Sequence, residues 1–228
     1  MKQMPLAIGL EPLPTFDNFA RGANEAALAH LRALHMPAAP VYLWGPSGSG
    51  KSHLLRALAH AAQREGHRVA WFDAASVLPW PLRPDWALVL IDRCDEFDAE
   101  RQHAAFMLFV DAATHGVQVA AAGRLPPVDL PLRDDLRTRL GWGHVFALQP
   151  LPEAGTRAVL RYELDERGLR VSDDVIDYLL THFPRDLSNL VALLARLDRF
   201  ALASGRPLTV PLLKRMLAEE AESAETAR

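Results

Sequence analysis

The chain has 228 residues, of which 50% are hydrophobic and 23% are charged, a balance typical of a folded globular protein. Its 25 Lys and Arg residues face 28 Asp and Glu residues, and neither side of Pro150 is basic, which argues against strong direct DNA binding and leaves room only for a local basic patch. The single cysteine, Cys94, excludes an internal disulfide. No apolar run approaches the ~20 residues of a membrane helix and no signal-peptide pattern is present, so we expect a cytoplasmic protein of one or two domains without membrane contact.

Residues 1–15 carry three prolines and scattered apolar side chains, which predicts an extended arm. Apolar periodicity then predicts, in chain order, a helix over Asn24–His35, a strand over Val41–Trp44, a helix over Ser52–Arg64, strands over Val69–Phe72 and Leu88–Ile91, a helix over Ala105–Ala113, a strand over Val117–Ala121, a helix over Leu132–Leu140 and a strand over Val145–Leu148. This alternation indicates an α/β fold with a five-stranded parallel sheet flanked by helices. Three prolines within residues 74–86 exclude a long crossover helix there.

Beyond Pro150 the strand pattern stops, and three or four helices are predicted: Ala154–Arg167, Asp173–His182, Asp186–Ser204 and Val210–Ala221. They are too few for a large domain. We therefore expect the arm over residues 1–15, an α/β nucleotide-binding domain over 16–150 and a small helical lid over 151–228.

A glycine-rich motif stands between the first predicted strand and the helix after it. It fits G-x-x-x-x-G-K-[ST] and consists of Gly45, Pro46, Ser47, Gly48, Ser49, Gly50, Lys51 and Ser52. Glycines let backbone N–H groups converge on a polyphosphate, and the helix N-terminus adds positive charge. Lys51 is expected on the β- and γ-phosphates and Ser52 on Mg²⁺. An incidental glycine turn is the alternative, which the flanking elements disfavour.

A P-loop needs a carboxylate at the end of a neighbouring buried strand to hold the metal's water shell, and Asp92 ends the strand Leu88–Ile91. Arg93 follows it where a second acid often orients the attacking water, so hydrolysis by this chain is in doubt. Asp95 or Glu96 could reach in only if the turn bends back. Cys94 is expected to be a small buried residue.

Two arginines have candidate roles. Arg139 lies near the end of a predicted helix, where it could enter the nucleotide site of an adjacent molecule as an arginine finger, and Arg185 lies near the start of a lid helix, where it could contact phosphate. A solvated surface arginine is the alternative for each.

These residues resemble the AAA+ proteins of the DnaA group, which includes the replication initiator DnaA and the regulatory inactivator Hda. The resemblance spans about residues 16–218. The phrases that carry it are Phe16-Asp17-Asn18-Phe19 with Gly22 and Asn24, the P-loop, Gly123 with Pro126-Pro127, Thr138-Arg139-Leu140-Gly141-Trp142-Gly143, Leu148-Gln149-Pro150-Leu151 and Arg185-Asp186-Leu187.

The resemblance implies binding of ADP or ATP with Mg²⁺. Phe16 and Phe19 are implied to help form the adenine pocket, Arg139 to be the finger and Arg185 the sensor arginine of the lid. The chain departs from the family pattern at Arg93 and at Arg124, near the sensor strand, and both departures are expected to put cations beside the γ-phosphate. Initiators also carry a helix-turn-helix domain and an N-terminal interaction domain, which this sequence lacks, so we do not expect it to read an origin by itself.

The arm resembles the short peptide with which bacterial proteins dock on the DNA polymerase sliding clamp. Gln3 supplies directional hydrogen bonds, while Met4, Leu6 and Ile8 fill apolar pockets. A leader without a partner is the alternative for so short a pattern.

The sequence leaves three functions open. The first is an adaptor that docks on the clamp, binds nucleotide and presents Arg139 to ATP held by DnaA, which negatively regulates replication initiation. The second is an autonomous ATPase such as a DnaC-like helicase loader. The third is a module that keeps nucleotide only as a structural ligand. The oligomeric state, including a homodimer, stays open.

Overall fold

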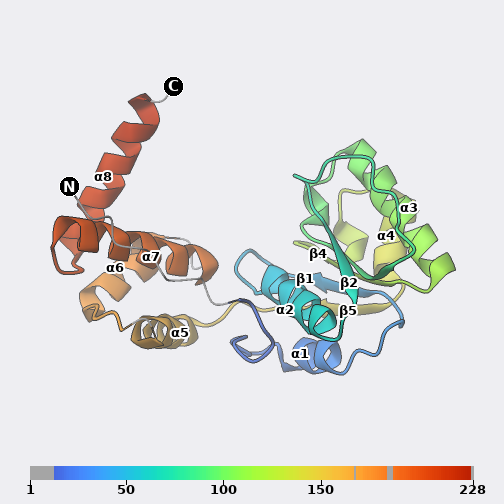
Figure 1. Cartoon of the computed structure of the whole chain (residues 1–228), viewed down its shortest axis with the longest axis horizontal. Coiled ribbons are helices and arrows are strands. Elements are labelled where there is room, and N and C mark those ends of the chain that lie inside the picture. The colour runs from blue at the N-terminus through green and yellow to red at the C-terminus, as the bar shows by residue number, and fades with distance from the viewer. Residues whose placement is uncertain (1–12, 167, 184–186, 227–228) are drawn as a thin grey trace. The chain divides into compact units, whose positions relative to one another are not determined.

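The computed structural model describes residues 13–166, 168–183 and 187–226 (Figure 1). The chain divides into two compact units, which meet in the sequence between Pro150 and Leu151. In the described ranges, no helix combines the length and the apolar character that crossing a membrane requires.

The first unit is built on a five-stranded sheet in the order β2-β3-β4-β1-β5. All neighbouring strands are parallel, as predicted. The strands are β1 (Val41–Trp44), β2 (Arg68–Phe72), β3 (Trp86–Ile91), β4 (Gln118–Gly123) and β5 (His144–Ala147). Helices cover both faces of the sheet, and the inner strands are therefore continuous apolar runs rather than alternating ones.

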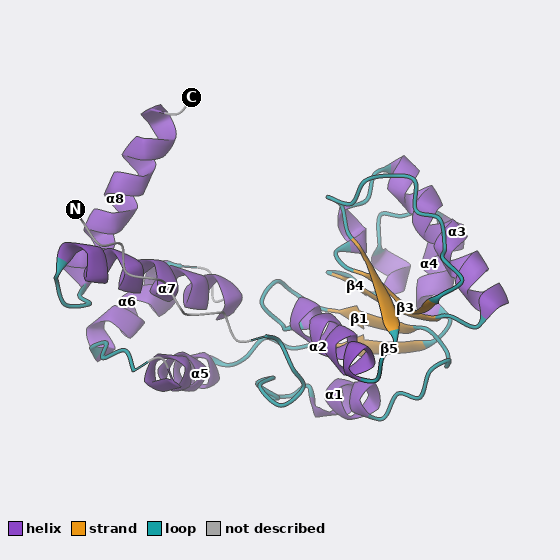
Figure 2. Cartoon of the chain, in the orientation of Figure 1, coloured by secondary structure: helices purple, strands orange, loops and turns teal. Residues whose placement is uncertain are grey.

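Four helices form the two outer layers: α1 (Glu25–Arg32), α2 (Lys51–Arg64), α3 (Ala99–His115) and α4 (Asp134–Gly141). Successive side chains of a strand point to opposite faces, so Leu43 and Leu90 pack with α1 and α2, whereas Tyr42 and Ile91 pack with α3 and α4. Figure 2 shows these two helix pairs on opposite sides of the sheet. Each face therefore has its own apolar core.

Helix α3 is longer than predicted, because it begins at Ala99 rather than Ala105. Asp98 caps it by accepting a hydrogen bond from the Arg101 backbone N–H at 2.9 Å. The first turns of α3 are polar, so apolar periodicity could not detect them. Gly116, with φ 67°, ends the helix.

The proline-rich connection between β2 and β3 contains no helix, as predicted. It is packed all the same: Trp80 is buried, and its ring lies 4.9 Å from that of Phe72 and 5.4 Å from that of Phe97. Two short 3-10 turns, η1 (Cys94–Glu96) and η2 (Pro127–Asp129), follow β3 and β4.

The second unit is helical, which confirms the predicted lid. It contains α5 (Glu153–Glu166), α6 (Asp173–His182), α7 (Leu187–Ser204) and α8 (Val210–Thr226). Its own core includes Leu160, Leu179, Leu190, Leu197 and Leu213. Helix α8 continues past Ala221, where its last turns are rich in Ala and Glu, which favour helix.

Candidate functional site

The loop of residues 45–50 leaves β1 and enters α2 through backbone conformations that favour glycine. Gly45, Gly48 and Gly50 have φ values of 151°, 75° and 93°. A Cβ on Gly45 would lie 2.3 Å from the Leu148 carbonyl oxygen, and one on Gly50 would lie 2.6 Å from the Phe19 ring. Close packing and a phosphate-cradling backbone therefore require the same glycines.

Lys51 opens α2, and its side chain is enclosed by the loop. The residue is only 8% exposed, and its Nζ donates to the Gly45 and Pro46 carbonyl oxygens at 2.7 and 2.8 Å. A buried ammonium needs such partners. The loop therefore holds a cation next to a helix N-terminus, which suits a polyphosphate.

Ser52 and Asp92 meet at the carboxyl end of β3. The Ser52 Oγ donates to Asp92 Oδ2 at 2.6 Å, and Asp92 Oδ1 accepts the Arg93 backbone N–H at 3.0 Å. Hydroxyl and carboxylate oxygens are ligands of the kind that Mg²⁺ takes, usually beside several waters. The pair therefore fits the predicted metal position.

The turn after Asp92 does bend back toward the sheet. Arg93 takes a left-handed conformation, with φ 52°, and η1 follows. Asp95 is thereby brought against Gly123 at the end of β4, where its carboxylate accepts from the backbone N–H and the Nε of Arg124 at 3.1 and 2.5 Å.

Both unexpected arginines are ion-paired. Arg93 lies 3.3 Å from Asp73 and 3.6 Å from Glu96, and Arg124 pairs with Asp95. The carboxylates that follow Asp92 are therefore occupied by arginines. From the sequence we expected Arg93 and Arg124 to lie beside the γ-phosphate. Their ion pairs with carboxylates were not predicted.

Cys94, between them, is 1% exposed, and burial raises its pKa to about 12. A thiol in this state is a poor nucleophile, in line with the expected buried role.

The segment before α1 lies along α2 and reaches the P-loop. Phe19 is buried against Gly50, and Phe16 packs at the edge of the same core. His53 Nε2 lies 2.9 Å from the Thr15 carbonyl oxygen, and His60 Nδ1 lies 2.8 Å from that of Pro14.

Burial lowers the pKa of His53, so the ring is neutral near pH 7 and its Nε2–H donates to the carbonyl. The sequence analysis missed these two histidines. Their seven-residue spacing, which puts both on one face of α2, was the available signal.

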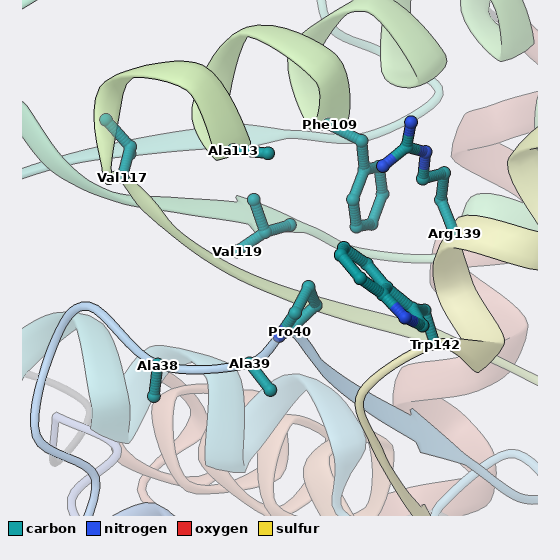
Figure 3. Close-up of a pocket in the computed structure, with 9 residues that line it drawn as sticks. All are labelled: Ala38, Ala39, Pro40, Phe109, Ala113, Val117, Val119, Arg139 and Trp142. Carbon is teal, nitrogen blue, oxygen red and sulfur yellow. The ribbon is translucent and has the colours of Figure 1, made fainter.

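Arg139 lies near the end of α4 and lines a cavity of about 430 Å³ (Figure 3). Its guanidinium lies over the Trp142 ring, 5.7 Å from the centroid. The cavity is lined in part by residues 38–40, just before β1, and by Val119 near the start of β4. It therefore opens at the amino-terminal edge of the parallel sheet, whereas the P-loop follows the carboxyl end of β1.

Five predicted residues lie outside the described residues: Gln3, Met4, Leu6, Ile8 and Arg185. Their roles stay predictions.

Known proteins share this fold. Residues 153–217 match the family model described as Hda, lid domain, and residues 10–80 match that of the IstB-like ATP binding protein. Domain III of the Thermotoga maritima replication initiation protein DnaA is similar at a TM-score of 0.74 and 21% identity, over 92% of this chain and 98% of that one. AMPPCP-bound DnaA from Aquifex aeolicus is similar at a TM-score of 0.60 and 23% identity, over 79% of this chain and 64% of that one. A T. maritima RuvB mutant is similar at a TM-score of 0.63 and 13% identity, over 92% of this chain and 73% of that one.

The chain is therefore similar to Hda in its lid and to an IstB-like ATP binding protein near its P-loop, and it shares its fold with domain III of DnaA. The described residues predicted to hold nucleotide lie together around the P-loop, and Arg139 lies apart from them.

The predicted nucleotide site is tested at Lys51. We expect Lys51→Ala to weaken ADP or ATP binding roughly 10- to 100-fold, because it removes a charge-assisted contact worth ~1.5–3 kcal/mol. Fluorescent-nucleotide titration measures the change. Lys214→Ala removes an exposed lysine of α8 and is the matched control. Thermal denaturation checks that the Lys51 variant and the wild type are both folded. If both are folded and bind nucleotide with equal affinity, Lys51 does not hold phosphate.

Proposed function

We propose that this protein is a nucleotide-binding regulator that stimulates hydrolysis of ATP bound to DnaA, and thereby limits replication initiation. One observation carries the proposal: the P-loop and Arg139 lie at opposite edges of one parallel sheet. At about 3.3 Å per residue, β1 alone separates these edges by roughly 13 Å. Arg139 is therefore better placed to act on a nucleotide of another molecule than on the one in its own P-loop.

The chain's own site is proposed to hold ADP or ATP. Lys51 and the glycine loop bind the phosphates, Ser52 and Asp92 hold Mg²⁺, and Phe16 with Phe19 borders the base. The resemblance adds Arg185 as a lid contact to phosphate. When bound, Mg²⁺ neutralises phosphate charge.

Hydrolysis at this site is proposed to be weak. Asp95 and Glu96 are the carboxylates after Asp92 that could activate water, yet Asp95 is bound to Arg124 and Glu96 lies beside Arg93. This pairing favours a resident nucleotide over a rapidly turned-over one, and it counts against an autonomous loader ATPase.

Arg139 is proposed to complete the site of DnaA. Guanidinium N–H groups donate to phosphate oxygens and stabilise the charge that develops as the γ-phosphoryl group transfers to water. Within the part of the chain that the structure describes, no carboxylate forms an ion pair with Arg139. The Trp142 ring, whose centroid lies 5.7 Å from the guanidinium carbon, does not neutralise the charge.

The arm is proposed to dock on the sliding clamp through Gln3, Met4, Leu6 and Ile8. The last residues of the arm are bound to α2, because His53 and His60 form hydrogen bonds with the carbonyl oxygens of Thr15 and Pro14. A clamp-bound arm therefore ends close to the P-loop helix.

Replacing Arg139 with Ala is expected to abolish stimulation of DnaA-bound ATP hydrolysis while leaving this protein's nucleotide affinity intact. Arginine fingers contribute about 10³–10⁵ in rate in well-studied NTPases, so the loss should be large. Single-turnover release of phosphate from ATP-loaded DnaA, with DNA-loaded clamp, measures it.

Arg137→Ala is the matched control, because Arg137 pairs with Asp134 and bonds the Val128 carbonyl instead of lining the cavity. Equal stimulation by the Arg139 variant and the wild type would refute the finger. If the isolated protein hydrolyses its own ATP as fast as DnaA does in the stimulated reaction, the alternative of an autonomous DnaC-like helicase loader is supported instead.

Deleting residues 1–8 is expected to abolish co-elution with the clamp and to leave the melting temperature nearly unchanged, because the contacts of Pro14 and Thr15 with α2 remain. A synthetic peptide of residues 1–10 should compete with the full chain for the clamp, and a version with Gln3→Ala and Leu6→Ala should not. Undiminished clamp binding by the truncated chain would assign docking to another surface.

A further inference from the structure

The cavity beside Arg139 is apolar apart from that one residue. Its walls come from residues 38–40, from Phe109 and Ala113 of α3, from Val117 just before β4 and from Val119 in β4. Trp142 forms the wall next to Arg139 (Figure 3). All of these residues belong to the first unit, so the cavity is a feature of the α/β fold itself.

Trp142 is held at the surface by the backbone on both sides of it. The backbone N–H of Trp142 donates to the Arg139 carbonyl oxygen at 3.4 Å, which extends the last turn of α4. A Cβ on Gly143 would lie only 1.9 Å from the Pro40 carbonyl oxygen, so that residue must be glycine for β5 to approach β1. Trp142 therefore stays 69% exposed beside the cavity. An exposed large aromatic side chain that adjoins an apolar cavity marks a binding surface.

The charge of this surface is one-sided. Among the described residues, Arg139 is the one charged side chain that lines the cavity, and no carboxylate pairs with it. Neighbouring Arg133 and Arg137 are paired with Asp135 and Asp134, so acids are available on α4 but face other arginines. A complementary partner must therefore bring an apolar side chain and an anionic group side by side.

We infer that the cavity receives one apolar side chain of a nucleotide-loaded AAA+ partner, while Arg139 contacts the partner's polyphosphate. This rests on the proposed function and extends it. Trp and Arg are the residue types that most often dominate binding energy at interfaces, particularly around a desolvated pocket. The cavity sets the affinity for the partner, and Arg139 sets the rate of hydrolysis in the complex.

The test fills the cavity without touching Arg139. Ala39 and Ala113 are exposed cavity residues, so Ala39→Leu and Ala113→Leu add bulk to the cavity and leave the buried core unchanged. Each is expected to raise at least 10-fold the concentration needed for half-maximal stimulation of ATP-loaded DnaA, with an unchanged plateau. Ala113→Ser, which adds little volume, should behave as wild type. Arg139→Ala should give the opposite pattern, a lost plateau with smaller loss of binding.

A direct binding measurement keeps the cavity testable by itself. The filled variants should bind immobilised ATP-loaded DnaA at least 10-fold more weakly than wild type does, whether or not hydrolysis follows. If wild type binds DnaA but does not stimulate it, the proposed function fails and the cavity is still judged by this comparison. Wild-type affinity in both filled variants would overturn the inference. So would a filled variant that keeps DnaA binding but turns a dimer of this chain into a monomer, because the occupant would then be a second copy.

Discussion

All five strands of the sheet run in one direction, and the chemistry of the α/β unit depends on this constraint. The carboxyl ends of β1 and β3 bring the P-loop and Asp92 to one edge, where Ser52 closes the contact between α2 and β3 at 2.6 Å. The amino ends of β1, β4 and β5 gather at the other edge, next to the end of α4. The proposed nucleotide site and Arg139 therefore lie at separate edges of one sheet.

The two edges differ in how their charges are satisfied. Lys51 and Asp92 are buried, and each has hydrogen-bond partners, because an isolated buried charge is too costly. Arg139 lies over the ring of the exposed Trp142 and has no carboxylate partner among the described residues. The first arrangement suits a site that keeps its ligand, and the second suits a group that becomes neutralised only when a partner arrives.

Much of the fold could be predicted from the sequence, because strands buried on both faces appear as uninterrupted apolar runs. The bounds of β1 and α6 agree with the prediction to the residue. The start of α3 could not be predicted from apolar periodicity, since its first turns are polar and its beginning depends on the Asp98 cap.

The P-loop could be recognised in the sequence because its glycines are tied to local backbone geometry. The cavity is different: residues 38–40, 109–119 and 139–142 meet only after the sheet forms. The pairing of Asp95 with Arg124 likewise depends on the left-handed turn at Arg93. The sequence did not predict this turn, because arginine is not a residue type that favours a left-handed conformation.

The central claim, that this chain acts on a nucleotide held by another molecule, is tested most directly by labelling one site at a time. DnaA is loaded with γ-labelled ATP and mixed, on DNA-loaded clamp, with this protein carrying unlabelled AMPPCP; the reverse loading is run in parallel. The account predicts rapid release of labelled phosphate only when the label starts on DnaA. Release only when the label starts on this protein would contradict it.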